Sequence, residues 1–169
     1  MGRTGWAVVV LVAAAVTGVL AWDGLVPSEP AGEWVSVGEV SARAGADVPA
    51  GVVRDELGVV ASGAGLAPGA GGPEAGELVG CVADWTGNGP ADAGQWAALE
   101  AGLTAKGWRV TARRGEPVPG TRLEEGPWTL EITNGGLLDT LSLYAHRSGA
   151  RCEEAFRREA ARRAATERG

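Results

Sequence analysis

Two cysteines carry the most readily predicted chemistry of this chain. Cys81 lies in an alternating apolar segment, and Cys152 opens a charged segment near the end of the sequence. In an exported chain an even pair of cysteines favours a disulfide, because oxidising conditions are available there. The alternative is a pair of buried thiols, which behave as small apolar residues. We therefore predict a Cys81–Cys152 disulfide that ties the end of the domain to its beginning.

His146 is the only histidine, and we expect it on the polar face of a strand together with Ser142 and Tyr144. A serine four residues away along a strand is roughly 13 Å distant. That distance is too long for the hydrogen bond between a nucleophile and its base. One histidine and two separated cysteines are also too few ligands for a zinc site. We predict no catalytic residue, no metal site and no cofactor.

Carboxylates and one glycine-rich turn offer the remaining chemistry. Three glutamates are candidates for a glycosidase acid and base, a pair that needs a defined separation in a cleft: Glu124, Glu125 and Glu131. Three residues between two predicted elements lack the spacing of a calcium loop: Asp84, Asn88 and Asp92. Residues 86–90 resemble a phosphate loop weakly, since a carboxylate at the next helix start would repel an anion. Surface and turn roles are favoured for all of them.

Three ring-bearing side chains are candidates for contact with a partner: Trp34, Tyr144 and His146. Tyr144 and His146 alternate with apolar residues, which places both on the exposed face of a strand. Trp34 is harder to assign, because no core segment surrounds it. Packing against the domain is the favoured reading for Trp34, since buried tryptophans supply much apolar area, and contact with a partner is the alternative.

The elements that position these residues begin with a helix between Asp92 and Trp108. Trp96, Leu99 and Leu103 recur with helical spacing. Asp92 is a good N-cap with a glutamine three residues later, as in a capping box. Gly107 suits a left-handed C-terminal position, after which Trp108 can contact Leu103. The helix thus turns directly into the next strand.

Period-two alternation predicts strands before and after that helix. Apolar residues alternate with polar ones over 108–113, 128–133 and 137–146, and Asn134-Gly135-Gly136 suits a tight hairpin turn. One apolar and one polar face per strand indicates a sheet that is antiparallel and exposed on one side. The fold class is therefore α+β, with a β-α-β-β-β-α domain over 77–169 whose mainly antiparallel sheet packs on a helix. A charged helix from Arg151 to Arg168 ends it, with acid-before-base pairs four residues apart.

Residues 6–22 contain no charged side chain and have a tryptophan at each end. Arg3 precedes this segment and acidic residues follow it, which predicts an N-terminal transmembrane helix with the remaining chain outside. Residues 1–22 are accordingly the membrane anchor, in a cytoplasmic membrane. A signal peptide cleaved after Ala21 is the alternative and gives a secreted protein.

Between anchor and domain we expect two weakly structured segments. Residues 23–60 form a juxtamembrane arm, in which Val53, Leu57 and Val60 have the spacing of a short helix from Asp47 to Ser62. Docking of this arm on the domain is left open. Residues 61–76 are rich in Gly, Ala and Pro and bury too little apolar surface to offset their backbone entropy. They form the linker.

Composition limits the class of partner. The formal net charge of −6 gives no electrostatic reason to bind nucleic acid. Lys106 is the only lysine among 15 basic residues, and 28 residues are glycine, which is typical of a GC-rich genome. In this general style, though in no diagnostic motif, the chain resembles small exported or membrane-anchored proteins of high-GC actinobacteria.

These features predict an exported, membrane-tethered protein of the cell envelope. It would act as a non-catalytic binding or accessory domain, with an envelope protein or polymer as its partner. Two alternatives remain. One is an envelope enzyme that uses surface carboxylates, and the other is a cleaved, secreted protein that binds a ligand.

Overall fold

A computed structural model of the chain describes residues 32–37, 47–69, 76–136 and 139–168. Its frame is one antiparallel sheet of six strands in the order β1-β3-β4-β5-β6-β2. The strands are β1 (Val35–Ser36), β2 (Val82–Thr86), β3 (Arg109–Arg114), β4 (Gly120–Glu125), β5 (Trp128–Gly135) and β6 (Thr140–Arg147). Strands β3 to β6 form a meander, and β2 is added beside β6.

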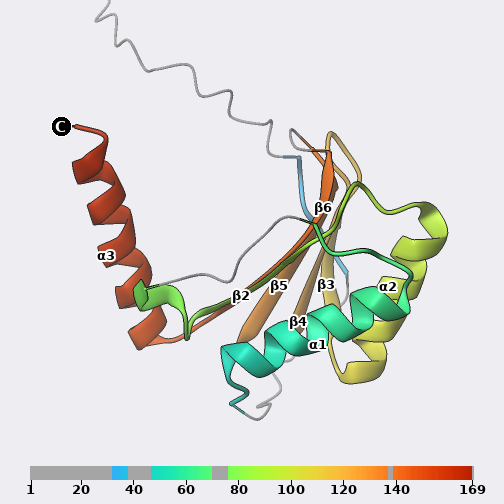
Figure 1. Ribbon diagram of the computed structural model, residues 1–169, viewed down its shortest axis with the longest axis horizontal. Helices are drawn as coiled ribbons and strands as arrows, with labels where there is room; N and C mark the ends of the chain where they lie inside the picture. The colour runs from blue at the N-terminus through green and yellow to red at the C-terminus, as the bar shows by residue number, and fades with distance from the viewer. Residues whose placement is uncertain (1–31, 38–46, 70–75, 137–138, 169) are drawn as a thin grey trace, which may run out of the picture.

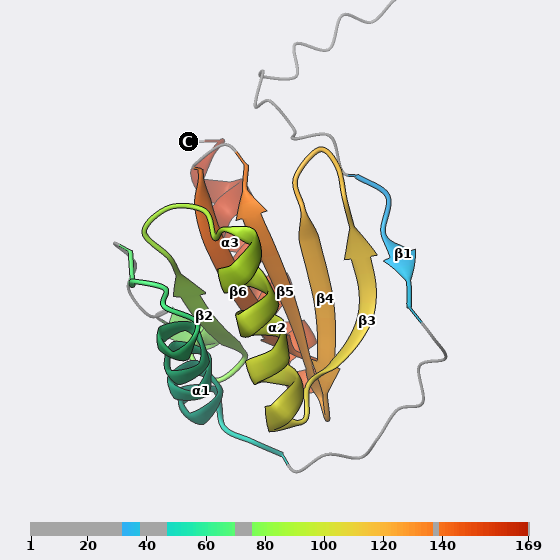
Figure 2. The ribbon, with the colours of Figure 1, turned by 90° about the vertical axis from the view of Figure 1, so that its right-hand side faces the viewer.

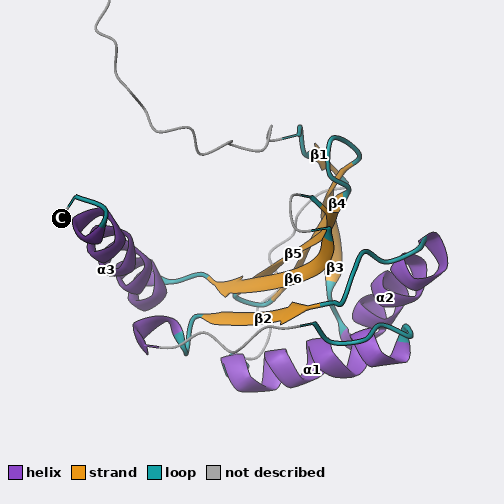
Figure 3. Ribbon diagram, turned by 45° about the horizontal axis from the view of Figure 1, so that its top comes forward, coloured by secondary structure: helices purple, strands orange, loops and turns teal. Residues whose placement is uncertain are grey.

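Three α-helices accompany the sheet: α1 (Ala50–Gly63), α2 (Ala93–Lys106) and α3 (Ala150–Thr166). Helices α1 and α2 lie side by side over one face (Figure 2), whereas α3 projects from the end of β6 (Figure 1). Among the described residues, no helix lies over the centre of the opposite face of the sheet (Figure 3). A short 3-10 helix, η1 (Gly76–Leu78), precedes β2 and lies beside the start of α3.

Helix α2 has both predicted ends. The Asp92 side chain accepts a hydrogen bond from the Gln95 amide at 2.9 Å, and the Gln95 side chain accepts one from the Asp92 amide at 3.1 Å. Gly107 has φ 113°, a left-handed conformation that residues with a Cβ resist. The Trp108 amide then donates to the Leu103 carbonyl at 3.2 Å. The capping box and the helix-to-strand corner are confirmed.

The core lies between the sheet and its two covering helices. Alternate residues of β5 and β6 point into it and are fully or almost fully buried: Trp128, Leu130, Ile132, Leu141, Leu143 and Ala145. Helix α2 contributes Leu99 and Leu103. The predicted α+β class and the antiparallel alternation are therefore confirmed.

The predicted arm contains two elements of the same body. Strand β1 pairs with β3, and α1 buries Val53, Leu57 and Val60 against the core. The Trp128 indole donates to the Val48 carbonyl at 3.0 Å, which fixes the entry to α1. Pro49, rather than Asp47, occupies the N-cap position. The structure thus docks this segment on the domain, the point that the sequence pattern left open.

The predicted fold needs two corrections. Four strands follow α2 rather than three, because β4 is a strand that the alternation did not indicate. No helix within the described part of the chain has both the length and the apolar character needed to cross a membrane. The predicted membrane anchor, residues 1–22, lies outside the described residues, so the predicted fold is corrected to the α+β body alone.

Candidate functional site

The disulfide stands at the centre of the candidate site. Cys81 and Cys152 are bonded, with an S–S distance of 2.05 Å and Cα atoms 5.5 Å apart, which confirms the predicted pair. Cys81 lies just before β2, and Cys152 lies in the first turn of α3. Their side chains are buried in a small cluster with Leu78, Val82 and Ala155. This cluster joins the start of α3 to the sheet.

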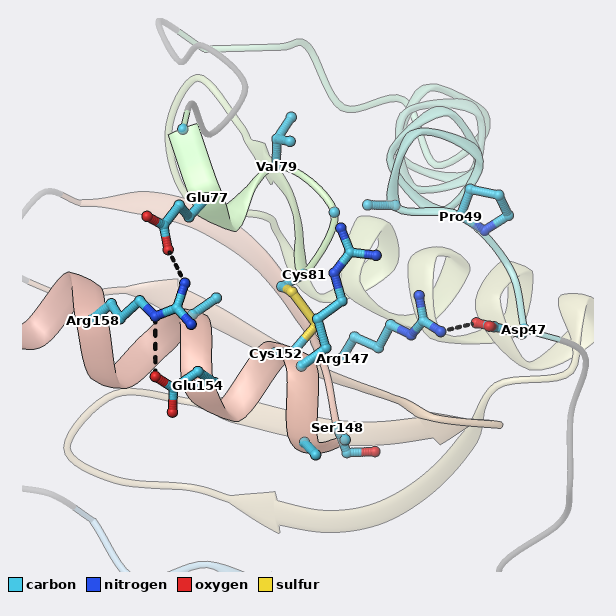
Figure 4. Close-up of a pocket in the computed structure, with 17 residues that line it drawn as sticks. Asp47, Pro49, Glu77, Val79, Cys81, Arg147, Ser148, Cys152, Glu154 and Arg158 are labelled. Carbon is cyan, nitrogen blue, oxygen red and sulfur yellow. Dashed lines mark hydrogen bonds and ion pairs between the residues drawn. A yellow bond between two sulfur atoms is a disulfide. The ribbon is translucent and has the colours of Figure 1, made fainter.

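A cavity of ≈ 770 Å³ opens beside the disulfide (Figure 4). Its walls come from four segments distant in the sequence: residues 47–50 at the entry to α1, residues 76–81 around η1, residues 147–149 after β6, and the first turns of α3. Val79, which is 55% exposed, and Pro49 give it apolar surface. The volume falls in the range of about 300–1,000 Å³ that is usual for small-ligand sites.

Ion pairs line two sides of this cavity. Arg147 pairs with Asp47 on one side. On the other, Arg158 lies 3.0 Å from Glu154 and 3.5 Å from Glu77. Figure 4 shows Arg158 between these two acids and Arg147 reaching toward Asp47. All the acidic side chains that line the cavity are therefore already paired with arginine.

Arg151 differs from the other two arginines of the cavity. It lines the wall next to Cys152, and among the described residues its side chain has neither a hydrogen bond nor an ion pair. Helix α3 also begins at Gly149 with no side-chain cap, and Gly149 to Cys152 all line the cavity. The positive end of the helix dipole adds to the potential there.

The open face of the sheet holds all three predicted partner-contact residues. Tyr144 and His146 project from β6, with ring centroids 6.2 Å apart, and Tyr144 is 37% exposed. Trp34 lies on the same face farther along the sheet, over β3 and β4, with the Arg114 and Arg122 guanidiniums 4.9 and 4.6 Å from its ring centroid. Such contacts stabilise packing. They dock Trp34 on its own domain, and contact of these three residues with a partner stays a prediction.

The candidate acid–base glutamates are divided between the two faces of the sheet. Glu131 pairs with Arg122 at 2.6 Å, and Glu124 lies on the same open face. Glu125 faces the other way, where burial and then the charge of Glu56 raise its pKa. The three carboxylates therefore do not converge on one substrate position.

The glycine-rich turn after β2 uses its backbone donors internally. The Gly87 amide donates to the Leu141 carbonyl at 2.7 Å, and the Asn88 amide donates to the Ala67 carbonyl at 3.0 Å. Asp84 pairs with Arg54 of α1 at 3.6 Å, while Asp92 caps α2. Within the described ranges no three His, Cys, Asp or Glu side chains gather as a metal site would require.

The sequence alone gave no signal for the cavity residues Arg147 and Arg151. Their neighbour Cys152 offered the one available clue, because the predicted disulfide brings residues near 152 beside residues near 81. The closeness of Asp47 to this point depends on α1, whose docking no local pattern indicated.

Comparison of the chain with protein-family models, with curated proteins and with solved structures finds no match. The site is therefore judged by its own geometry.

Proposed function

We propose that this chain is an exported, non-catalytic binding domain, and that the cavity beside the disulfide is its ligand site. One observation carries the proposal. Segments from both ends of the fold form an open cavity of ≈ 770 Å³ beside a covalent link, with walls that are partly apolar and partly charged. A concavity of this size in which polar groups converge is a candidate small-ligand site.

Export is supported by the chemistry of the disulfide. Disulfides persist in oxidising compartments and are rare in the reducing cytosol. The uncharged segment 6–22 adds a sequence argument, although it lies outside the described residues. A reporter enzyme that works only outside the cytoplasm, fused after Gly169, should be active. Activity of a reporter that works only inside would contradict export.

The cavity is tested by filling it. A side chain at Gly80 would meet nothing within 4 Å at its Cβ, and Gly80 lines the cavity. Gly80→Trp should block ligand binding and leave the fold intact. Gly115→Trp is the matched control, because Gly115 is equally free of contacts and lies in the loop between β3 and β4, away from the cavity.

The measurement is a fragment screen of the ¹⁵N-labelled full chain by NMR. We expect bound fragments to shift the amides of residues 76–81 and 147–155, in the parent and in Gly115→Trp but not in Gly80→Trp. Shifts confined to Thr133, Ser142 and Tyr144 would contradict the cavity. They would instead assign binding to the open sheet face, the second candidate, which no helix covers (Figure 3).

A further inference from the structure

We propose that the cavity selects an acidic ligand, and that Arg151 binds its anionic oxygens while the wall at Val79 and Pro49 contacts an apolar part of the same molecule. This inference rests on the proposed function of the cavity. It adds the chemical class of the ligand: a carboxylate or phosphate group carried on a small apolar body.

The charge distribution carries the first step. Three arginines and three acidic residues line the cavity, so the number of lining charges alone predicts no preference between an anionic and a cationic ligand. Glu154, however, is also held by Arg157 at 2.7 Å, and Arg157 does not line the cavity. With every lining acid paired, the positive charge of Arg151 is the one left without compensation by the described residues.

The chemistry of arginine carries the second step. A guanidinium presents several N–H donors in a planar fork that matches a carboxylate or a phosphate. The paired arginines beside it, Arg147 and Arg158, disfavour a cationic ligand, because a cation would have to compete for acids that are already bound. An anion at Arg151 meets no such cost.

The position of Arg151 carries the third step. It follows Ala150 and precedes Cys152, whose sulfur is bonded to Cys81. The disulfide therefore fixes the backbone of Arg151 opposite the turn that holds Val79. An anionic group at the arginine and an apolar group at the valine would lie within one cavity, which favours a ligand that carries both.

Three probes of similar size separate charge from shape: benzoate, phenyl phosphate and neutral benzamide. Each is titrated into the ¹⁵N-labelled full chain while the amides of residues 76–81 and 147–155 are followed. Benzoate or phenyl phosphate should bind more tightly than benzamide, and their order distinguishes a carboxylate site from a phosphate site. Arg151→Gln should weaken the binding of both anions roughly three- to tenfold. This loss lies between the contribution of an exposed ion pair and that of a hydrogen bond to a charged group.

Arg168→Gln is the matched control, since it removes the same charge just after the end of α3, outside the cavity. It should leave all three affinities unchanged. Equal binding of benzoate, phenyl phosphate and benzamide at the cavity would overturn the assignment of ligand class and leave the binding function standing. Anion binding that Arg151→Gln does not weaken would overturn the role of Arg151. If no fragment in the screen shifts the amide signals of the residues that line the cavity, the binding function itself is refuted.

Discussion

Helices α2 and α3 are attached to the same sheet in different ways. Helix α2 is capped at both ends and buries Leu99 and Leu103 completely. Helix α3 is three residues longer, yet it begins without a side-chain cap and buries only Cys152 and Ala155. Packing and hydrogen bonds hold α2, whereas α3 depends on one covalent bond beside a small apolar cluster.

Their charged residues show the same contrast. Glu100 of α2 accepts hydrogen bonds from Arg113 on β3, Thr121 on β4 and the Trp96 indole. On α3, Glu159 pairs with arginines of its own helix, while Arg158 pairs with Glu77 of η1. Polar groups can therefore fasten a helix to a sheet when they are partly buried and cross between elements. Exposed pairs within one helix contribute little to docking.

The largest expected effect comes from removing the covalent link. Replacing both cysteines by alanine should lower the free energy of unfolding by about 4 kcal/mol, the chain-entropy estimate for a loop of this length. The two positions are 71 residues apart. Chemical denaturation measures the loss, and amide hydrogen exchange should show faster exchange in α3 than in α2. Equal protection of α3 before and after the substitution would show that its apolar cluster is sufficient.

Removing the crossing network of α2 should rank second. Glu100→Ala removes the acceptor of the buried Thr121 hydroxyl and the carboxylate partner of the half-exposed Arg113 guanidinium, which should cost roughly 1–3 kcal/mol. Glu159→Gln is the control on α3, and we expect no measurable change in unfolding there because its partners lie on the exposed helix surface. A similar loss in the two variants would remove the contrast between the helices.

The caps of α2 should have the next largest effect. Asp92→Ala should destabilise the chain by about 1 kcal/mol, the usual value for a lost N-cap. Gly107→Ala should cost a similar amount, about 1 kcal/mol, since an L-residue resists the left-handed conformation. Thermal unfolding of each single variant and of the double variant provides the measurement. If both single variants have the same melting temperature as the parent, α2 is held by its buried face alone.

The smallest expected effect is a pH dependence of the free energy of unfolding, to which two glutamates contribute with opposite signs. Burial alone would raise the pKa of Glu100, but hydrogen bonds from Arg113 and Thr121 and the charge of Arg113 outweigh it, so the pKa is lowered. Its contribution to stability is present above the unfolded-state pKa and is lost as pH falls through the folded-state pKa. Glu125 has a raised pKa, so its contribution is present at acid pH and is lost as pH rises through the folded-state pKa.

Denaturation curves at neutral and acid pH test both signs. Glu100→Gln should lose less stability on acidification than the parent does. Glu125→Gln should be slightly more stable than the parent at neutral pH, with the gain disappearing as the pH falls. A neutral-pH loss in Glu125→Gln would mean that this carboxylate is stabilised by contacts that outweigh its burial.

How far the sequence predicts this fold depends on how local each signal is. The ends of α2 follow from residues within a few positions of one another, and they are confirmed. Strand β4 went unrecognised because Leu123 is its only large apolar residue. Besides Leu123, its buried positions are Gly120, which Trp34 approaches closely, and Thr121, which donates a hydrogen bond to Glu100. Those reasons for burial lie in other elements.

The candidate site was the least predictable part for the same reason. Its walls combine four segments, and only the cysteine pair carried information about distant contacts. The helical spacing of Val53, Leu57 and Val60 indicated α1, but spacing within a helix does not say which surface will cover it. No apolar segment surrounds Trp34 in the sequence, so its packing could not be predicted locally. In the structure its neighbours lie on β3 and β4.

The place of β2 sets the order in which the fold can be completed. Strands β3 to β6 each pair with the next strand along the chain, but β2 has β6 as its strand neighbour, so Val82 cannot pair until His146 is present. Cys81 likewise emerges long before Cys152. With two cysteines in the whole sequence, one intramolecular pairing exists and none can be wrong. Oxidation therefore requires no choice between partners, and the chain needs no reshuffling of disulfides to reach its final form.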